Sequence, residues 1–262
     1  MKKPEWVIRK EQARRAARPE TVWLFGLHAV RDALRNPARQ RLRLVVTKNA
    51  ADRLSDAIAV SGMTPEIADP RRFPVPLDPQ SVHQGAALEV RPLDWGTLEE
   101  RCRPGAGEAP VVVLLDRVSD PRNVGAILRS AEVFGARAVI APLRHSAPET
   151  GALAKAASGA LERQPYLRVR NLAAAIGALR EMGYAVLGLD GAAEATLDEA
   201  VRAEGGSRPL AFVLGAEGPG LRLRSRENCD RLMRIPAAGD FGSLNVSNAA
   251  AVTLYAAFRA LD

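Results

Sequence analysis

The chain has 262 residues, of which 47% are hydrophobic and 26% charged, and its formal net charge is +7 at pH 7. This composition is close to the globular average, which excludes a disordered chain, a collagen-like chain and a disulfide scaffold. The sequence contains no apolar run long enough for a transmembrane helix and no N-terminal secretory signal, so we expect a cytoplasmic protein without membrane contact.

The cysteines and histidines are not arranged as metal ligands. Cys102 and Cys229 form no C-x-x-C pair, and the three histidines are never paired at metal-ligand spacing. The sequence therefore predicts no metal site, and this sparse use of cysteine is typical of a reducing cytosol.

The excess positive charge is concentrated at the N-terminus. Residues 1–22 contain seven Lys or Arg and three Asp or Glu, together with Pro4 and Pro19. This composition predicts a basic flexible tail. Such a tail either contacts nucleic-acid phosphates and releases counterions or only improves solubility, and charge alone does not decide between the two.

Residues 23–95 are predicted to form a small α/β domain. Strands are expected at 21–25, 42–47 and 86–90, and helices at 27–34 and 51–60. Strands alternating with helices over about seventy residues are typical of such a module. The polar stretch 96–109, which is rich in Gly and Pro, is predicted to be a linker.

A second domain is predicted over 110–262. It begins with the unbroken apolar run 110–115, which is typical of a strand buried on both faces of a parallel sheet. Further strands are expected at 138–141, 184–189, 210–214 and 231–235, and helices at 123–134, 172–182 and 246–261. This alternation predicts an open parallel α/β sheet, in which ligands bind at the carboxyl ends of the strands.

Two strand-to-loop junctions of this domain contain unusual residues. In the first, 116–129, Asp120 and Pro121 suit a turn, and either Asn123 or Asp120 can cap the helix that follows. Arg129 lies six residues after Asn123, so both side chains could face the same end of the sheet. The second, 214–221, has three glycines and a proline, which let the backbone turn sharply or approach a ligand. Its glycines match neither a dinucleotide fingerprint nor a phosphate-binding loop, and Glu217 is its only charged residue.

The third junction, 235–247, leads into the last predicted helix. It contains Ser243, Asn245 and Ser247, whereas a helix cap needs only one such side chain, and the nearby free amides favour a polar or anionic ligand. The three junctions contain no His, no Cys and no paired carboxylates, which excludes a hydrolase triad, a glycosidase dyad and a two-metal nuclease. These residues fit better a reaction in which the protein mainly orients its substrates and needs no strong acid–base pair.

Taken together, the three junctions resemble the three sequence motifs of the SpoU class of the SPOUT superfamily of RNA ribose 2′-O-methyltransferases. Residues 123–131 resemble motif 1, residues 214–221 motif 2, and residues 235–236 with 243–247 motif 3. The segments 25–35 and 82–87 resemble the L30e-type RNA-binding domain of family members that methylate a guanosine of 23S rRNA.

The resemblance implies an RNA (guanosine-2′-O-)-methyltransferase that uses S-adenosylmethionine and no metal. It implies a small L30e-like N-terminal domain and a C-terminal α/β domain with a trefoil knot, through which two copies form a homodimer. Periodicity alone would not suggest a knot, because knots are close to absent among folds. The catalytic residues carried over are Arg129, Asn123, Glu217, Ser243 and Asn245, and the cofactor-binding residues are Leu214, Gly215, Ile235, Leu244 and Gly191.

The family assigns activation of the ribose hydroxyl to the arginine matched by Arg129. Because an arginine is hard to deprotonate, we favour a phosphate clamp that lowers the proton affinity of the hydroxyl over a general base. The expected partner is RNA, with 23S rRNA as the target. The alternatives are a tRNA or resistance-type rRNA 2′-O-methyltransferase of the same class, and a non-catalytic RNA-binding assembly protein. The separate first domain argues against the small tRNA type, and the complete set of motif residues argues against a protein without activity.

Overall fold

The computed structural model describes residues 21–78, 80–204, 208–239 and 243–261. Nearly all of the basic tail predicted over 1–22 lies outside these residues. The chain divides into two compact units, a first that ends at Leu93 and a second that begins at Asp94. No helix in the described part of the chain is long and apolar enough to cross a membrane.

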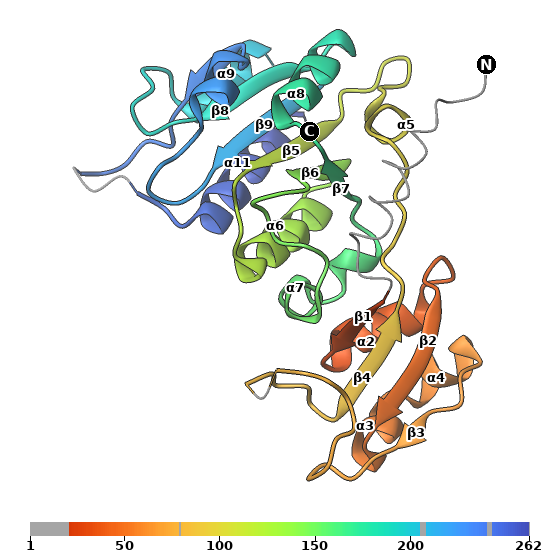
Figure 1. Ribbon diagram of the computed structural model, residues 1–262. Coiled ribbons are helices and arrows are strands. Elements are labelled where there is room, and N and C mark those ends of the chain that lie inside the picture. Colours follow the sequence, from red (N-terminus) through yellow and green to blue (C-terminus); the bar gives the residue numbers. More distant parts are fainter. Residues whose placement is uncertain (1–20, 79, 205–207, 240–242, 262) are drawn as a thin grey trace, which may run out of the picture. The chain divides into compact units, whose positions relative to one another are not determined.

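The first unit is a four-stranded sheet with helices (Figure 1). Its elements are β1 (Val22–Phe25), α2 (Leu27–Arg35), β2 (Arg41–Val46), α3 (Lys48–Arg53), α4 (Ser55–Ser61), β3 (Glu66–Ile67) and β4 (Ala86–Val90). The strand order is β1-β4-β2-β3, in which β4 pairs antiparallel with β1 and β2 while β3 pairs parallel with β2. Leu24, Val30, Leu44 and Leu88 are buried and join the sheet and α2 into one core.

The predicted helix 51–60 is two helices in the structure. Thr47 starts α3 three residues earlier than expected, because its side chain accepts a hydrogen bond from the Ala50 amide, as an N-cap does. The chain then bends at Leu54, which ends α3 and precedes α4. Apolar spacing continues through this bend, so the pattern alone does not reveal the break.

The second unit contains a six-stranded sheet. Its elements are α5 (Leu98–Cys102), β5 (Val111–Asp116), α6 (Pro121–Val133), β6 (Ala138–Pro142), α7 (Gly151–Ala157), the 3₁₀ helix η1 (Ala160–Glu162), β7 (Tyr166–Val169), α8 (Leu172–Glu181), β8 (Ala185–Leu189), α9 (Leu197–Glu204), β9 (Leu210–Gly215), α10 (Leu223–Glu227), β10 (Arg231–Met233) and α11 (Val246–Leu261). The strand order is β10-β8-β9-β5-β6-β7, and every pair is parallel. The predicted open parallel sheet is therefore confirmed.

Helices pack in two groups around this sheet. α6 packs against α7 and α11, and α11 also packs against α9, whereas α8 packs against α5 and α10 (Figure 1). Successive strand residues point to opposite faces, so alternate side chains of the apolar strands pack against the helices on one face or the other. The cluster that includes α8 is anchored by Tyr184, whose hydroxyl donates a 2.6 Å hydrogen bond to the Cys102 carbonyl.

The stretch 96–109, predicted to be a linker, belongs to the second unit. Thr97 and Glu100 form a reciprocal capping box that starts α5, and Cys102 at the end of this helix is fully buried. The Gly and Pro content suggested a free connection, but the Thr-x-x-Glu signature inside it specifies a helix start. The polar composition therefore marked a surface helix rather than a flexible spacer.

Several short elements were not predicted, namely β3, α7, η1, β7, α9 and α10. They have two to eight residues each, which is too short for periodicity to identify them. Helix-capping hydrogen bonds and strand-pairing hydrogen bonds determine where these elements begin and end. Thr150, for example, accepts a hydrogen bond from the Leu153 amide and so starts α7.

Gly125 allows α6 and α7 to pack closely. A Cβ atom built at Gly125 would lie 2.5 Å from the Ala156 Cβ and 2.8 Å from the Leu153 carbonyl oxygen. We expect Gly125→Ala to lower the free energy of unfolding of the second unit by about 1–3 kcal/mol, because helix backbone has to move. Chemical denaturation of the full chain measures this loss.

Gly177 in α8 provides the matched control, since a Cβ atom built there meets nothing within 4 Å. Gly177→Ala is expected to stabilise the helix by about 0.5–1 kcal/mol. Equal stability of the two alanine variants would contradict the packing role of Gly125.

Candidate active site at the carboxyl ends of the strands

The three junctions singled out in the sequence meet at one edge of the second sheet. β5 and β9 are neighbouring strands, and Asp116 at the end of β5 pairs with Gly215 at the end of β9. The loops that follow these strands therefore leave the sheet side by side. The segment before α11 joins them through hydrogen bonds, so residues more than a hundred positions apart in sequence meet here.

Three polar side chains, one from each junction, form a hydrogen-bonded network. Glu217 Oε1 accepts hydrogen bonds from Asn123 Nδ2 at 2.9 Å and from Asn245 Nδ2 at 2.6 Å. Asn245 Nδ2 also lies 3.1 Å from Asn123 Oδ1. Asn245 Oδ1 in turn accepts from the Ser247 amide and hydroxyl, which caps the start of α11. The network therefore cross-links the three loops and the last helix.

This network is accessible to a ligand. The Glu217 side chain is exposed, and its second oxygen, Oε2, makes no hydrogen bond to any other residue that the structure describes. Two amide donors orient the carboxylate and hold it in place. A carboxylate held in this way can orient a hydroxyl group or a cationic group of a bound molecule.

The helix that contains Asn123 begins at Pro121, two residues before the predicted start, and Asp120 rather than Asn123 is its N-cap. The Asp120 side chain accepts a hydrogen bond from the Arg122 amide, and Pro121 occupies the first helical position. The Arg122 guanidinium, which hydrogen-bonds to Asp120, holds the pKa of that carboxyl below its usual value. Asp120 therefore remains ionised as a structural cap and is not a proton donor near neutral pH.

A cavity of about 450 Å³ lies beside the network. All five residues expected to bind a cofactor line it, namely Leu214, Gly215, Ile235, Leu244 and Gly191. Glu217 and Ser243 line it as well, so the cavity and the polar network share a wall. The sequence-based set of cofactor-binding residues thus lies together in the structure.

The glycine loop 215–220 folds tightly back on itself. The Gly220 amide donates a hydrogen bond to the Ala216 carbonyl at 3.0 Å. A Cβ atom built at Gly215 would lie 2.5 Å from the Leu221 amide nitrogen and still closer to the Gly220 carbonyl group. Gly218 and Gly220 have φ angles of +81° and +64°, which glycine adopts readily. The glycines are thus required by the shape of this loop.

Arg129 is not part of the network. It lies six residues after Asn123 on α6, about 9 Å further along the helix axis and about 120° around it. Its side chain is exposed and forms no hydrogen bond or ion pair with any residue in the described part of the chain. That both side chains face one end of the sheet stays a prediction, because no contact joins them in the described part of the chain. The guanidinium of Arg129 is available to an external anion.

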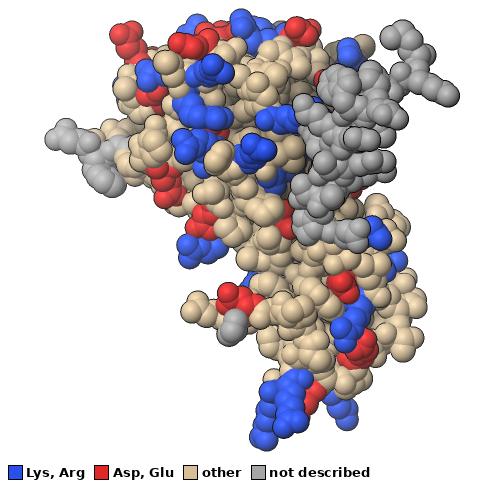
Figure 2. Space-filling model, viewed as in Figure 1, with Lys and Arg blue, Asp and Glu red and all other residues tan. Residues whose placement is uncertain are grey.

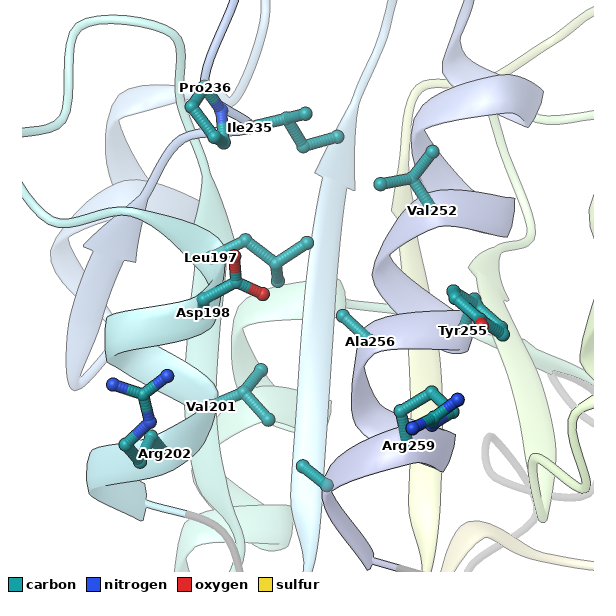
Figure 3. Close-up of a pocket in the computed structure, with 11 residues that line it drawn as sticks. Leu197, Asp198, Val201, Arg202, Ile235, Pro236, Val252, Tyr255, Ala256 and Arg259 are labelled. Carbon is teal, nitrogen blue, oxygen red and sulfur yellow. The ribbon is translucent and has the colours of Figure 1, made fainter.

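A second cavity, of about 620 Å³, lies between α9 and α11 (Figure 3). Leu197 and Val201 of α9 face Val252 and Ala256 of α11 across it, and Ile235 borders both cavities. It is the larger of the two, but the polar network is not part of its wall. We therefore assign the chemistry to the smaller cavity.

Sequence reasoning missed one buried charge at this edge. Asp116 ends β5 with its side chain fully buried, and the Arg222 side chain donates to it through Nε at 2.6 Å. The sequence feature that points to it is a single acidic residue at the end of an otherwise apolar strand. Buried carboxylates are costly unless paired, so this position indicates a partner elsewhere in the chain.

Comparison with known proteins agrees with this arrangement. Residues 110–255 match the model of the SpoU rRNA Methylase family. The chain is 38% identical over 246 residues to the 23S rRNA (guanosine-2'-O-)-methyltransferase RlmB of Photorhabdus laumondii, covering 90% of this chain and 97% of that protein. The RlmB protein of Yersinia pestis is 37% identical over the same share of this chain and 96% of its own length.

Solved structures show the same fold at lower identity. The SpoU methyltransferase AviRb from Streptomyces viridochromogenes, solved with AdoMet, has a TM-score of 0.74 at 24% identity and covers 92% of this chain and 90% of its own. An AdoMet-bound rRNA methyltransferase from Sinorhizobium meliloti has a TM-score of 0.76 at 24% identity, over 93% and 88% of the two chains. The family model, the full-length relatives and the shared fold lead to one conclusion: this chain is a member of the SpoU rRNA methylase family.

Proposed function

We propose that the chain is an S-adenosylmethionine-dependent RNA 2′-O-methyltransferase that modifies the ribose of a guanosine in 23S rRNA. The observation that carries the proposal is the Asn123–Glu217–Asn245 network beside a glycine-lined cavity. The relatives named RlmB, which align along almost their whole length, support the choice of 23S rRNA and of guanosine.

The cavity is suitable for S-adenosylmethionine. Its volume of about 450 Å³ is in the range that holds small-molecule ligands. Leu214, Ile235 and Leu244 give it apolar walls suited to a nucleobase, and the backbone of the glycine loop offers hydrogen-bonding groups. A Cβ atom built at Gly191 or Gly218 meets nothing within 4 Å, so these glycines border open space where side chains would otherwise project.

The chain's own residues would align the substrate rather than activate it strongly. When bound, S-adenosylmethionine supplies a methyl group on a positively charged sulfur, so the ribose oxygen needs positioning and the loss of its proton. Asn123, Ser243 and Asn245 position the ribose, the phosphate and the loops. Glu217 holds the two asparagines. Arg129 binds a phosphate and lowers the proton affinity of the 2′-hydroxyl, whose proton passes to water.

Each of the two units has its own part in the proposed function. The first unit serves as an L30e-like RNA-binding domain, supported by its mixed four-stranded sheet and by the segments 25–35 and 82–87. The second unit contains a trefoil knot, supported by the path of the chain after β10. Ile235 and Leu244, on either side of residues 240–242, both line the cavity together with the glycine loop and Gly191, and α11 then packs against α6.

RNA binding is also consistent with the charge. The chain has 37 Lys or Arg and 30 Asp or Glu, and the basic side chains in Figure 2 are spread over the visible surface of each unit. Such a distribution contacts an extended phosphate backbone at many points. Both cysteines are free thiols, which is the state expected in the cytoplasm, where we place the protein.

We also propose a homodimer through the second unit. Val133 at the end of α6 is 67% exposed, and Val252, Tyr255 and Phe258 are exposed on α11, which packs against α6. The Phe134 ring lies 5.8 Å from the ring of Tyr255, which makes the apolar surface continuous between the two helices. An exposed apolar face of this kind is typical of a protein–protein interface, and a two-fold axis would bury it against itself.

The test is methyl transfer from tritium-labelled S-adenosylmethionine to total bacterial RNA. We expect the label in 23S rRNA, on the 2′-oxygen of one guanosine, after nuclease digestion and mapping. Excess S-adenosylhomocysteine should suppress the transfer, which provides the control. Label in tRNA would favour a tRNA methyltransferase, and label at another rRNA ribose would favour a resistance-type enzyme. Cofactor-independent RNA binding without label in any RNA would favour an assembly protein and contradict the proposal.

A further inference from the structure

The short helix α10 follows the glycine loop directly and is tied to two strands by two arginines. Arg222, at its start, donates from Nε to Asp116 Oδ1 at 2.6 Å and from its backbone amide to Asp116 Oδ2 at 3.0 Å. Arg226, one turn later, forms a 2.8 Å ion pair with Asp190 Oδ2. Asp116 ends β5 and Asp190 follows β8, and these two strands flank β9 in the sheet.

Because both aspartate side chains are largely buried, these ion pairs fix where the two arginines of α10 lie. The Asp116 side chain has no exposed surface and that of Asp190 is 15% exposed, whereas the two arginine side chains are about half exposed. A buried carboxylate is costly unless a cation and hydrogen bonds compensate it. The buried Asp116 carboxylate therefore holds the Arg222 side chain in a fixed position, and the start of α10 with it.

The Asp116 pair fixes the exit of the glycine loop. Asp116 pairs in the sheet with Gly215, the residue at which the loop begins. Arg222 lies immediately after Leu221, where the loop ends. The entry of the loop is held by the β9 ladder and its exit by Arg222, so Glu217 and the cavity wall between them have a defined position.

The Asp190 pair fixes another part of the cavity wall. Asp190 is next to Gly191, which lines the cavity, and its Oδ1 accepts a hydrogen bond from the Ala192 amide. Its own amide donates to the Met233 carbonyl, two residues before Ile235. Asp190 therefore joins α10 to two further segments of the cavity wall.

We propose that the pairs Asp116–Arg222 and Asp190–Arg226 form an ion-pair clamp that positions the glycine loop and thereby sets the affinity for S-adenosylmethionine. The inference rests on the proposed function, because it takes the cavity as the cofactor site. The four clamp residues are positioning residues. They act through the loop and contact neither of the reacting groups.

The experiment compares Arg222→Ala and Arg226→Ala with Arg224→Ala in the full chain. Arg224 is on the same helix, is exposed, and forms no ion pair with any residue that the structure describes, so it is the matched control. By calorimetry, Arg222→Ala is expected to weaken S-adenosylmethionine binding about tenfold and Arg226→Ala about threefold, whereas Arg224→Ala leaves it unchanged. At saturating cofactor, kcat should stay within about twofold, so the effect falls on the KM for S-adenosylmethionine.

Two further measurements separate positioning from a general loss of stability. Hydrogen exchange of the cofactor-free chain should become faster in residues 216–220 of Arg222→Ala and remain unchanged in β5 and β9. Arg226→Lys, which keeps a positive charge opposite Asp190, should retain most of the affinity that Arg226→Ala loses.

The clamp would be disproved if Arg222→Ala bound the cofactor as Arg224→Ala does. It would also be disproved if exchange increased throughout the sheet rather than in the loop. If the unaltered chain bound no S-adenosylmethionine, the proposed function would fail, whereas the exchange measurement on the cofactor-free chain would still support or reject the clamp.

Discussion

Arg129→Ala is expected to reduce methyl transfer about a thousandfold while leaving the affinity for S-adenosylmethionine within about twofold. Arg129 does not line the cavity, and it forms no hydrogen bond or ion pair with any described residue, so its removal disturbs neither the cofactor site nor the fold. Its proposed task is to hold a phosphate of the RNA and stabilise the negative charge that develops on the ribose oxygen. Single-turnover transfer and calorimetric cofactor binding measure the two effects.

Arg180→Ala is the control for this result. Arg180 is half exposed on α8, among the other group of helices, and among the described residues it forms an ion pair with Asp230 alone. Its loss should therefore change neither measurement by more than about twofold. Arg129→Lys keeps a positive charge without the planar fork, so a phosphate clamp predicts an intermediate rate. Loss of cofactor affinity in Arg129→Ala would show that the assigned role is wrong.

Gly215→Ala is expected to weaken S-adenosylmethionine binding about a hundredfold. The added Cβ would overlap the Gly220 carbonyl group and approach the Leu221 amide nitrogen to 2.5 Å, and these are backbone atoms of the loop. Relief requires the loop to open, which moves Glu217 and the wall of the cavity together. Calorimetry measures the affinity, and methyl transfer should fall in parallel at subsaturating cofactor.

Gly177→Ala, in open space on α8, controls for the addition of a methyl group elsewhere in the same unit. The circular dichroism spectrum of Gly215→Ala should match that of the unaltered chain, because the sheet itself is not overpacked. Wild-type affinity in Gly215→Ala would mean that the loop adapts freely, and the argument for a rigid glycine loop would then be wrong.

Much of the second unit could be predicted because its elements are long and strongly patterned. The runs 110–115 and 210–214 are apolar throughout, as strands buried between two helical layers must be. The short elements are different. α5 lies inside the stretch predicted to be a linker, and neither α5 nor α10 is predicted from the pattern, because five residues do not complete two helical turns. Their positions depend on a capping box and on ion pairs with distant residues.

The residues of the candidate site could be named from the three motifs, and the cavity residues do lie together. Their contacts could not be predicted. Nothing in the spacing indicates that Glu217 joins Asn123 to Asn245. These relations depend on which strands are neighbours and where each loop leaves the sheet.

The sequence by itself determined the family, the parallel α/β class of the second unit and the candidate residues of the site, because apolar periodicity and motif chemistry are local properties of the chain. Only the tertiary structure decided how the loops are joined and anchored. The ion pair of Asp116 with Arg222 spans 106 positions of sequence. It forms because a buried carboxylate is costly unless a cation compensates it, and only the folded sheet brings Arg222 next to Asp116.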